Sequence, residues 1–454
     1  SAHRDYESAA KAYRDAGLPW TIAEFTGPLL PDSENAAVGW EALFLVKEKR
    51  RKAMGGSQDT GSERPDLNGM LSKADLAPSL AYLKGVESDL EDLSRFARLP
   101  FQIKKDWSLG PKLRFEECPA AQDCVMDLLL RTEVRILQGN VQGALADLRL
   151  AARCALQMKG AASFAHQIVA AHLQNMIATT ALKAATHRPA DSRFLDEIGE
   201  VLDSLSAAPS IRQSVRGEAF LMLQSLRYSS FTPLDLEFLG KGGVRRDPSP
   251  DASHEVQGLV NRSYAAEAFE FWTRLYSELG PEGEEDWERF IKACPPSEER
   301  FRPALRNLRD VRRYERRNFM EVGDSRFILR SVPDLRELLG FLSRSHAYTL
   351  TARTALELTA ARLSGSNASE APTDPLGKGK LKVEAAVGRV KVWSFGLDRD
   401  DDGGIREQPR PKMPPMKRGD PPRPLRPPEG DITAELPWRP RHDSSAASTR
   451  TAQP

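Results

Sequence analysis

The sequence predicts a mainly α-helical protein of stacked helical pairs, followed by a small C-terminal β-hairpin module and a disordered, proline-rich tail. Apolar residues recur at helical spacing through most of the first 365 residues, which is typical of amphipathic helices. The period changes to two between residues 381 and 395, as expected for two strands joined by a tight turn. Eleven of the 32 prolines then fall between residues 409 and 440, where they exclude helix and sheet interior.

Length and charge narrow the classes of protein to consider. A chain of 454 residues is too long for one ordinary core, so two or three domains are expected. The 65 basic residues almost cancel the 64 acidic ones, which excludes an overall basic field for nucleic acid or anionic lipid. No apolar run reaches about 18 residues, so we expect no membrane-spanning segment. The first residue is Ser1, which leaves room for an upstream signal or membrane anchor.

Residues 1–110 are predicted to form an N-terminal helical region. Helical spacing over residues 6–16 ends at a Gly-Leu-Pro turn, and a second helix begins near Asn35 and runs into a basic stretch. Gly, Ser, Asp and Pro dominate residues 55–68, which predicts a loop. Helical spacing returns over residues 76–97, where one or two further helices are expected.

The most regular helical pattern occupies residues 111–229 and predicts a repeat-like helical domain. Two helices flank Gly139 as an αα-hairpin, and the second ends at Gly160, because a cation followed by Gly favours a helix end. A third helix is expected over residues 164–185, and its many alanines allow close approach between helix axes. One more pair of helices is expected over residues 193–205 and 215–226.

A Gly- and Pro-containing loop over residues 230–254 precedes a second helical region over residues 255–365. Helices are expected there over residues 255–279, 286–293, 298–317 and 334–363. A polar linker then leads into the C-terminal module, residues 366–437, which holds the hairpin and a proline-rich insertion. Residues 438–454 are predicted to be a disordered tail.

Three segments resemble a group of uncharacterised bacterial proteins. They are residues 13–42 with their Ala-Gly-Leu-Pro turn, the hairpin around Gly139 and the C-terminal module. The hairpin also resembles a tetratricopeptide repeat, with Gly139 at the turn and alanines where the helices meet. The resemblance implies an exported or membrane-anchored bacterial protein with a helical, tetratricopeptide-like body, located outside the cytoplasm or at the membrane. It implies no known activity.

The C-terminal module resembles the C-terminal domain of type II secretion major pseudopilins. The residues that carry the likeness are Asp374-Pro375-Leu376-Gly377 before the hairpin, Ser394 to Arg399 after it, and Asp431-Ile432. In those proteins the corresponding loop binds calcium. Here the proline-rich insertion between Gly404 and Asp431 is much longer than the family's loop, and the N-terminal pilin helix is not visible.

A cluster of aspartates in this module also points to calcium binding. Asp398, Asp400 and Asp402 stand in a loop that ends in two glycines, and carboxylate oxygens in a flexible loop suit Ca²⁺ better than Mg²⁺ or zinc. With Asp431 from the pseudopilin likeness, they are our candidate metal ligands. The terminal Glu of an EF-hand is missing, and the alternative interpretation is a solvated acidic turn.

One predicted helix carries a basic stripe. It consists of Arg302, Arg306, Arg309, Arg313 and Arg316, spaced three and four residues apart. Such a stripe suits a phosphate group or an acidic protein partner, and the alternative is a solvated face with nearby acidic pairs. Because no aromatic residues interleave to stack bases, nucleic acid is not the expected partner.

The sequence offers no motif for catalysis. It has no Gly-rich phosphate loop and no nucleophile elbow, and its seven histidines include no pair at zinc-binding spacing. His166 and His172 are interpreted as packing or surface residues, and Cys118 and Cys124 as free thiols unless they close a loop in an oxidising compartment. We therefore expect a non-enzymatic, extracytoplasmic scaffold or protein-binding protein with a calcium-stabilised C-terminal module. The alternatives are a structural subunit of a secretion or pilus-like assembly and a phosphate- or nucleic-acid-binding protein using the arginine stripe.

Overall fold

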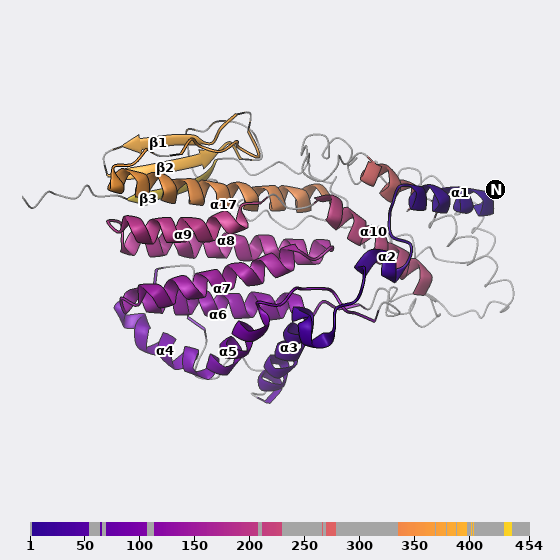
Figure 1. Ribbon diagram of the computed structural model, residues 1–454, viewed down its shortest axis with the longest axis horizontal. Helices are drawn as coiled ribbons and strands as arrows, with labels where there is room; N and C mark the ends of the chain where they lie inside the picture. Colours follow the sequence, from indigo (N-terminus) through magenta and orange to yellow (C-terminus); the bar gives the residue numbers. More distant parts are fainter. Residues whose placement is uncertain are drawn as a thin grey trace, which may run out of the picture.

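The protein is mainly helical with a small β module near its C-terminus, as the sequence predicts, and this module is a three-stranded antiparallel sheet. The computed structural model describes residues 2–53, 64–65, 70–106, 113–207, 211–228, 266, 269–277, 335–367, 369–377, 379–386, 388–396, 401, 403 and 431–437. Figure 1 shows the helices in layers, with the sheet on one outer side of the stack and the α3 to α5 region on the other.

The N-terminal region is a series of helices and short turns. They are α1 (Ala2–Asp15), α2 (Ile22–Thr26), η1 (Asp32–Glu34), α3 (Ala36–Ala53), η2 (Lys73–Asp75), α4 (Leu76–Gly85) and α5 (Glu87–Phe96). α1 ends where predicted, because Gly17 takes a φ of 81° that few other residues adopt. A capping box between Thr21 and Glu24 starts α2.

The central helices are α6 (Glu117–Leu137), α7 (Val141–Lys159), α8 (Phe164–His187), α9 (Ser192–Leu205) and α10 (Ile211–Tyr228). Three of them begin at polar side chains that accept a backbone N–H of the first turn: Asn140 for α7, Ser163 for α8 and Asp191 for α9. Gly139, with a φ of 77°, forms the turn of the predicted αα-hairpin between α6 and α7. Local signals therefore set these helix ends.

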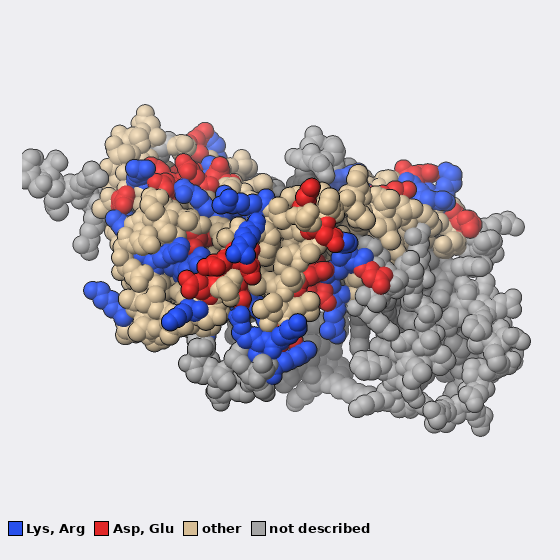
Figure 2. Space-filling view, turned by 60° about the horizontal axis from the view of Figure 1, so that its bottom comes forward, with Lys and Arg blue, Asp and Glu red and all other residues tan. Residues whose placement is uncertain are grey.

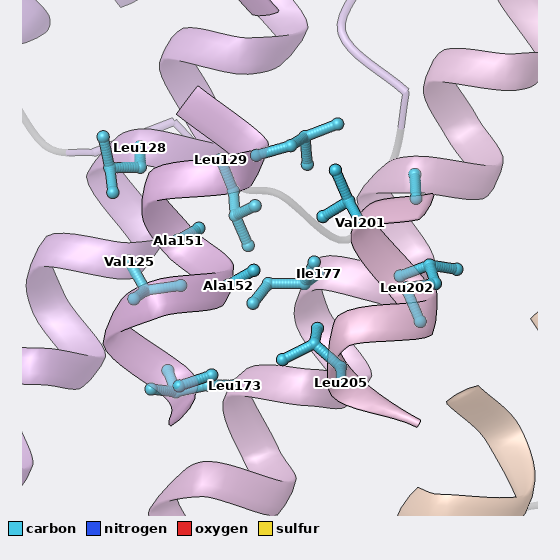
Figure 3. Packing of buried hydrophobic residues seen from close by; sticks show 14 of the residues in the cluster. Val125, Leu128, Leu129, Ala151, Ala152, Leu173, Ile177, Val201, Leu202 and Leu205 are labelled. Carbon is cyan, nitrogen blue, oxygen red and sulfur yellow. The ribbon is translucent and has the colours of Figure 1, made fainter. Parts of the chain in front are cut away.

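The main core lies between α6, α7, α8 and α9. Leu128, Ala151 and Ile177 are fully buried and come from three of these helices. Figure 3 shows such side chains pointing toward one another between the helices, with Val201 and Leu202 from α9 completing the cluster. Alanines at the contacts bring the axes close, as the repeat-like pattern predicts. The described part of the chain holds no helix long and apolar enough to cross a bilayer.

The long helix α17 (Leu335–Ser364) joins the sheet to this core. It packs against α8 and α9 on one side and against the second and third strands on the other (Figure 1). Val390, Val392 and Leu436 of the sheet belong to the same buried cluster as the central helices. The C-terminal sheet and the helical body thus share one hydrophobic core.

The sheet has the order β1-β2-β3, with β1 (Lys382–Ala386), β2 (Arg389–Ser394) and β3 (Ile432–Pro437). β1 and β2 form the predicted hairpin, and Gly388 at its turn has a φ of 86°. The interpretation of residues 409–440 as extended and largely disordered does not foresee β3. Residues 429–436 contain no proline, and the alternation of buried Ile432, Ala434 and Leu436 is a strand pattern.

A second buried cluster lies at the other end of the molecule. It is built from α1, α2, α10 and residues 269–277, with Tyr13, Phe220 and Trp272 among its largest side chains. Residues 269–277 are helical, as predicted for that part of residues 255–279. The predicted loop at 230–254, the predicted helices at 286–293 and 298–317, and the tail at 438–454 lie outside the described residues.

Candidate functional site

An open groove of about 750 Å³ lies beside the end of α7. One wall is the turn and short irregular segment 97–101 that follows α5, and the other is the last turns of α7. The groove is lined by Ala97, Arg98, Leu99, Pro100, Phe101, Arg153, Leu156, Gln157 and Gly160. Its volume is typical of a site for a small molecule or a few residues of a peptide.

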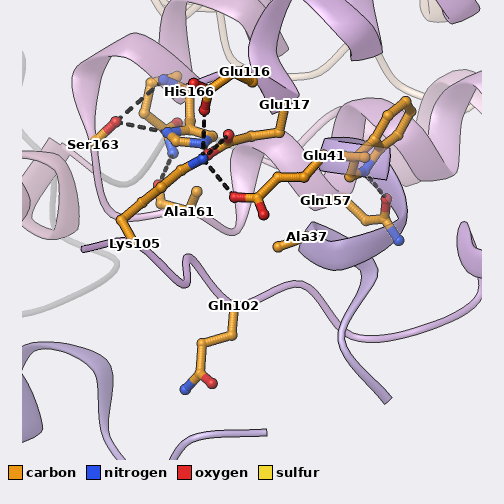
Figure 4. A network of polar contacts seen from close by, with 12 residues as sticks. Ala37, Glu41, Gln102, Lys105, Glu116, Glu117, Gln157, Ala161, Ser163 and His166 are labelled. Atoms are coloured by element: carbon orange, nitrogen blue, oxygen red, sulfur yellow. Dashed lines mark hydrogen bonds and ion pairs between the residues drawn. The ribbon is translucent and has the colours of Figure 1, made fainter. Parts of the chain in front are cut away.

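Hydrogen bonds fix both walls of the groove. The buried amide of Gln157 accepts from Nε1 of Trp40 at 2.9 Å and donates to the carbonyl oxygen of Leu99 at 2.9 Å. Figure 4 shows Gln157 bonded to an indole ring beside the polar cluster described below. The carbonyl of Pro100 accepts the backbone N–H of Ala36 at 2.9 Å. The wall segment is therefore tied to both α3 and α7, and the groove is formed before any ligand arrives.

Two arginines give the groove its charge. Arg98 stands on the segment wall and Arg153 on the α7 wall, and both side chains are exposed. Within the described residues, neither has an ion-pair partner. By contrast, Arg131 and Arg135 both bind Asp147. No acidic residue lines the groove.

A partly buried polar cluster lies close to Gln157 and the groove (Figure 4). The ammonium of Lys105 contacts three carboxylates, with distances of 2.6 Å to Glu41, 2.9 Å to Glu116 and 2.9 Å to Glu117. The ring of His166 packs 5.7 Å from the ring of Phe101, a groove residue, measured between centroids. This contact connects the cluster to the groove.

The three carboxylates are close enough together to suggest a metal centre. However, the ammonium of Lys105 already lies among them and supplies the cation, so the cluster is an ion-pair centre. Burial opposes the charged form of Glu117, but the hydrogen bond and charge of His166 and the charge of Lys105 more than offset it. The pKa of Glu117 therefore lies below its usual range, while the carboxylates raise the pKa of Lys105 despite its burial.

Ser163, His166 and Glu117 stand in a row that has the composition of a catalytic triad. His166 Nδ1 lies 2.7 Å from Ser163 Oγ, and its Nε2 lies 3.0 Å from Glu117 Oε1. All three residues are at most 1% exposed, so a substrate cannot reach the hydroxyl. Ser163 also caps α8 by accepting the N–H of His166. The row stabilises the start of α8 and does not form an active site.

Of the four predicted calcium ligands, the structure describes only Asp431. Asp431 is fully buried at the start of β3, and it belongs to no group of three metal-ligating side chains in the described residues. Asp398, Asp400 and Asp402 lie outside the described residues. Their neighbour Asp401 is exposed and accepts from Nε1 of Trp393 at 3.0 Å and from the N–H of Gly403 at 3.1 Å.

The structure describes the predicted thiol and histidine residues but not the predicted arginine stripe. The arginine stripe Arg302, Arg306, Arg309, Arg313 and Arg316 lies outside the described residues. Cys118 and Cys124 are free and buried on α6, which agrees with the interpretation as free thiols. His166 is a packed core residue, as predicted, but its bonds to Ser163 and Glu117 were not foreseen.

Sequence reasoning missed both groove arginines. Arg98 and Arg153 are single basic residues among apolar neighbours and match no motif. The one local signal is that neither has an acidic residue three or four positions away that could pair with it. Only the fold brings them into one groove.

Comparisons with known proteins add no relationship. No protein-family model, no curated protein and no solved structure matches the chain. The function therefore has to be argued from the groove and its surroundings.

Proposed function

We propose that the protein is a non-enzymatic, extracytoplasmic scaffold whose helical body holds a short segment of a partner protein in the groove beside α7. The observation that carries this proposal is the groove itself, because both of its walls are fixed by buried hydrogen bonds. A preformed site loses little conformational entropy when it binds a flexible segment.

The lining of the groove favours binding over catalysis. Half-buried Leu99, Phe101 and Leu156 provide an apolar floor, while the charges stand at the rim. The lining contains no Ser, Cys, His, Asp or Glu to act as nucleophile or general base. Stacked helices with small-residue contacts are also an architecture that commonly presents surfaces to partners.

A site-specific crosslinking experiment tests this proposal. A photoreactive amino acid replaces Leu156 in the groove, and in a control protein it replaces Leu45, which is 56% exposed on α3. Both proteins are expressed in native cells, which are then irradiated. We expect one discrete crosslinked product from position 156 that is absent from position 45. The same products from both positions, or none from position 156, would show that the groove holds no partner segment.

We also propose that calcium stabilises the C-terminal module. Support comes from the register of β2 and β3, in which Ser394 pairs with Ile432. The buried carboxylate of Asp431 therefore lies at the end of the sheet where the loop with Asp398, Asp400 and Asp402 leaves β2. Bound there, Ca²⁺ would bridge these carboxylates and tie the loop to β3.

A further inference from the structure

We infer that the partner segment in the groove is an acidic peptide, with carboxylates on both sides of an apolar residue. The inference rests on the proposed binding role and adds the chemistry of the ligand. It starts from the charge of the lining, which holds two arginines and no acidic residue. The whole chain has a net charge of only +1, so this local excess of positive charge is not a general property of the protein.

Two other arginines close to the groove residues in the sequence are each paired with a carboxylate. On the same helix as Arg153, one turn earlier, Arg149 binds Glu197 at 3.2 Å. Near Arg98, Arg95 binds Asp92 at 2.9 Å. Among the described residues, Arg98 and Arg153 have no such carboxylate, and both line the groove. A guanidinium offers a planar fork of donors that fits a carboxylate by two parallel hydrogen bonds.

The two arginines and the apolar lining suit a ligand that carries both acidic and apolar groups. Arg98 follows α5 and Arg153 belongs to α7, so the two exposed guanidinium groups come from different elements of the groove. Leu99, Phe101 and Leu156 form the apolar surface of the groove. In an extended Asp-X-Asp peptide with X on this surface, both Asp side chains point away from the apolar floor, toward the rim where the exposed arginines stand, since residues i and i+2 of a strand share a face.

A peptide explains the groove better than the alternatives. A small inorganic anion would use the charge and leave the apolar surface uncovered. A nucleic acid would need a longer basic track with stacking aromatics, and the face shown in Figure 2 has basic and acidic residues interspersed. The volume of about 750 Å³ suits a few residues of extended chain.

Fluorescence anisotropy with the purified full chain tests this inference. The probes are fluorescein-labelled peptides Ala-Asp-X-Asp-Ala, in which X is Leu, Ile, Val, Phe or Met, and matched peptides with Asn in place of both Asp. We expect the Asp peptides to bind roughly tenfold or more tightly than the Asn peptides, because each charge-assisted hydrogen bond contributes more than a neutral one. Arg98→Gln and Arg153→Gln should each weaken the Asp peptides roughly tenfold. Arg149→Gln, which removes a paired arginine on the same helix, should change nothing.

Several outcomes would overturn the inference. Equal binding of Asp and Asn peptides, or arginine variants that bind like the wild type, would show that the ligand is not acidic. Absence of binding by every Asp peptide would also show that the groove does not bind an acidic peptide of this kind. Displacement of the Asp peptides by a short single-stranded oligonucleotide at lower concentration than by unlabelled peptide would point to nucleic acid. In each case a specific crosslink from position 156 would still support the proposed binding role, so the two failures are distinguishable.

Discussion

His166 Nε2 lies 3.0 Å from Glu117 Oε1, although the two residues are 49 positions apart on different helices. The contact joins the start of α8 to the start of α6, and both side chains are at most 1% exposed. The ring of Phe101, which lines the groove, packs 5.7 Å from the ring of His166 between centroids. The groove wall is thereby in contact with a buried, hydrogen-bonded pair of side chains.

Replacing Glu117 by Gln should destabilise the protein by about 3 kcal/mol at pH 7, because Lys105 would lose its most buried carboxylate partner. Urea unfolding followed by circular dichroism measures the loss. Glu116→Gln is the matched control, since the side chain of Glu116 is 34% exposed and contacts the same ammonium. That control should cost less than about 1 kcal/mol.

The effect of Glu117 should also depend on pH. Its folded-state pKa lies below the ordinary value of 4.5, so its stabilisation is complete above pH 4.5 and is lost as the pH falls through the folded value. The difference between wild type and Glu117→Gln should therefore shrink in acid. A constant difference down to pH 3 would contradict this assignment.

Glu218 should show the opposite pH dependence. Burial raises the pKa of Glu218 to about 7, although its carboxylate accepts the N–H of Phe164 at 2.9 Å. Between pH 4.5 and 7 the unfolded chain loses this proton and the folded protein keeps it, so stability falls as the pH rises. Glu218→Gln keeps an acceptor for the N–H of Phe164 but cannot titrate. The wild type should therefore lose about 2 kcal/mol of unfolding free energy over this range, and the variant should not. Unfolding curves at pH 5 and pH 8 check the prediction, and parallel losses in both proteins would refute it.

Gly217→Ala should destabilise the protein by roughly 1–3 kcal/mol, because a Cβ atom at this position would overlap the carbonyl of Ala162 in the turn before α8. The control is Gly199→Ala in α9, where an added Cβ would meet only Glu357 Cγ at 3.8 Å. Removing a helical glycine there should stabilise the protein by up to about 1 kcal/mol. Thermal unfolding of both variants compares the two effects, and equal midpoints would contradict the close packing of α10 on this turn.

Helix positions could be predicted from the sequence because local signals decide them. α7 ends at Lys159 before Gly160, and α17 covers residues 335–364 where helical spacing predicts a helix over 334–363. The hairpin was predictable for the same reason, since period two and Gly388 lie within a few residues of each other. The third strand was missed because the surrounding prolines obscured a short alternating segment.

The candidate site could not be predicted, because long-range contacts create it. Lys105 and Glu117 are 12 positions apart and belong to different elements, and Arg98 and Arg153 line one groove although 55 positions separate them in the sequence. In the sequence each is one charged residue among many. Single-sequence patterns show which helix face is apolar, but they do not show which charges on different elements meet.

Asp374→Ala should destabilise the C-terminal sheet and, through the shared core, the whole protein. The buried carboxylate accepts from the N–H groups of Leu376 and Phe395 and from the hydroxyl of Ser394 at 2.7 Å. Losing these three bonds should cost about 3 kcal/mol. Asp401→Ala removes an exposed carboxylate from the same module and should cost less than about 1 kcal/mol. One cooperative transition in urea, shifted for Asp374→Ala alone, is expected, whereas a separate early transition would show that the sheet unfolds independently.

Calcium should raise the thermal midpoint of the wild-type protein relative to protein in excess chelator. An ion that binds only the folded state at 100 times its Kd adds about 2.7 kcal/mol of stability. Asp398→Ala and Asp400→Ala should abolish the difference, and Mg²⁺ at the same concentration should produce a smaller one, because Mg²⁺ accommodates irregular oxygen cages poorly. Asp431 is a poorer choice for this test, since its burial means that substitution alone would disturb β3. Equal midpoints with Ca²⁺ and with chelator would leave the aspartate loop as a solvated acidic turn.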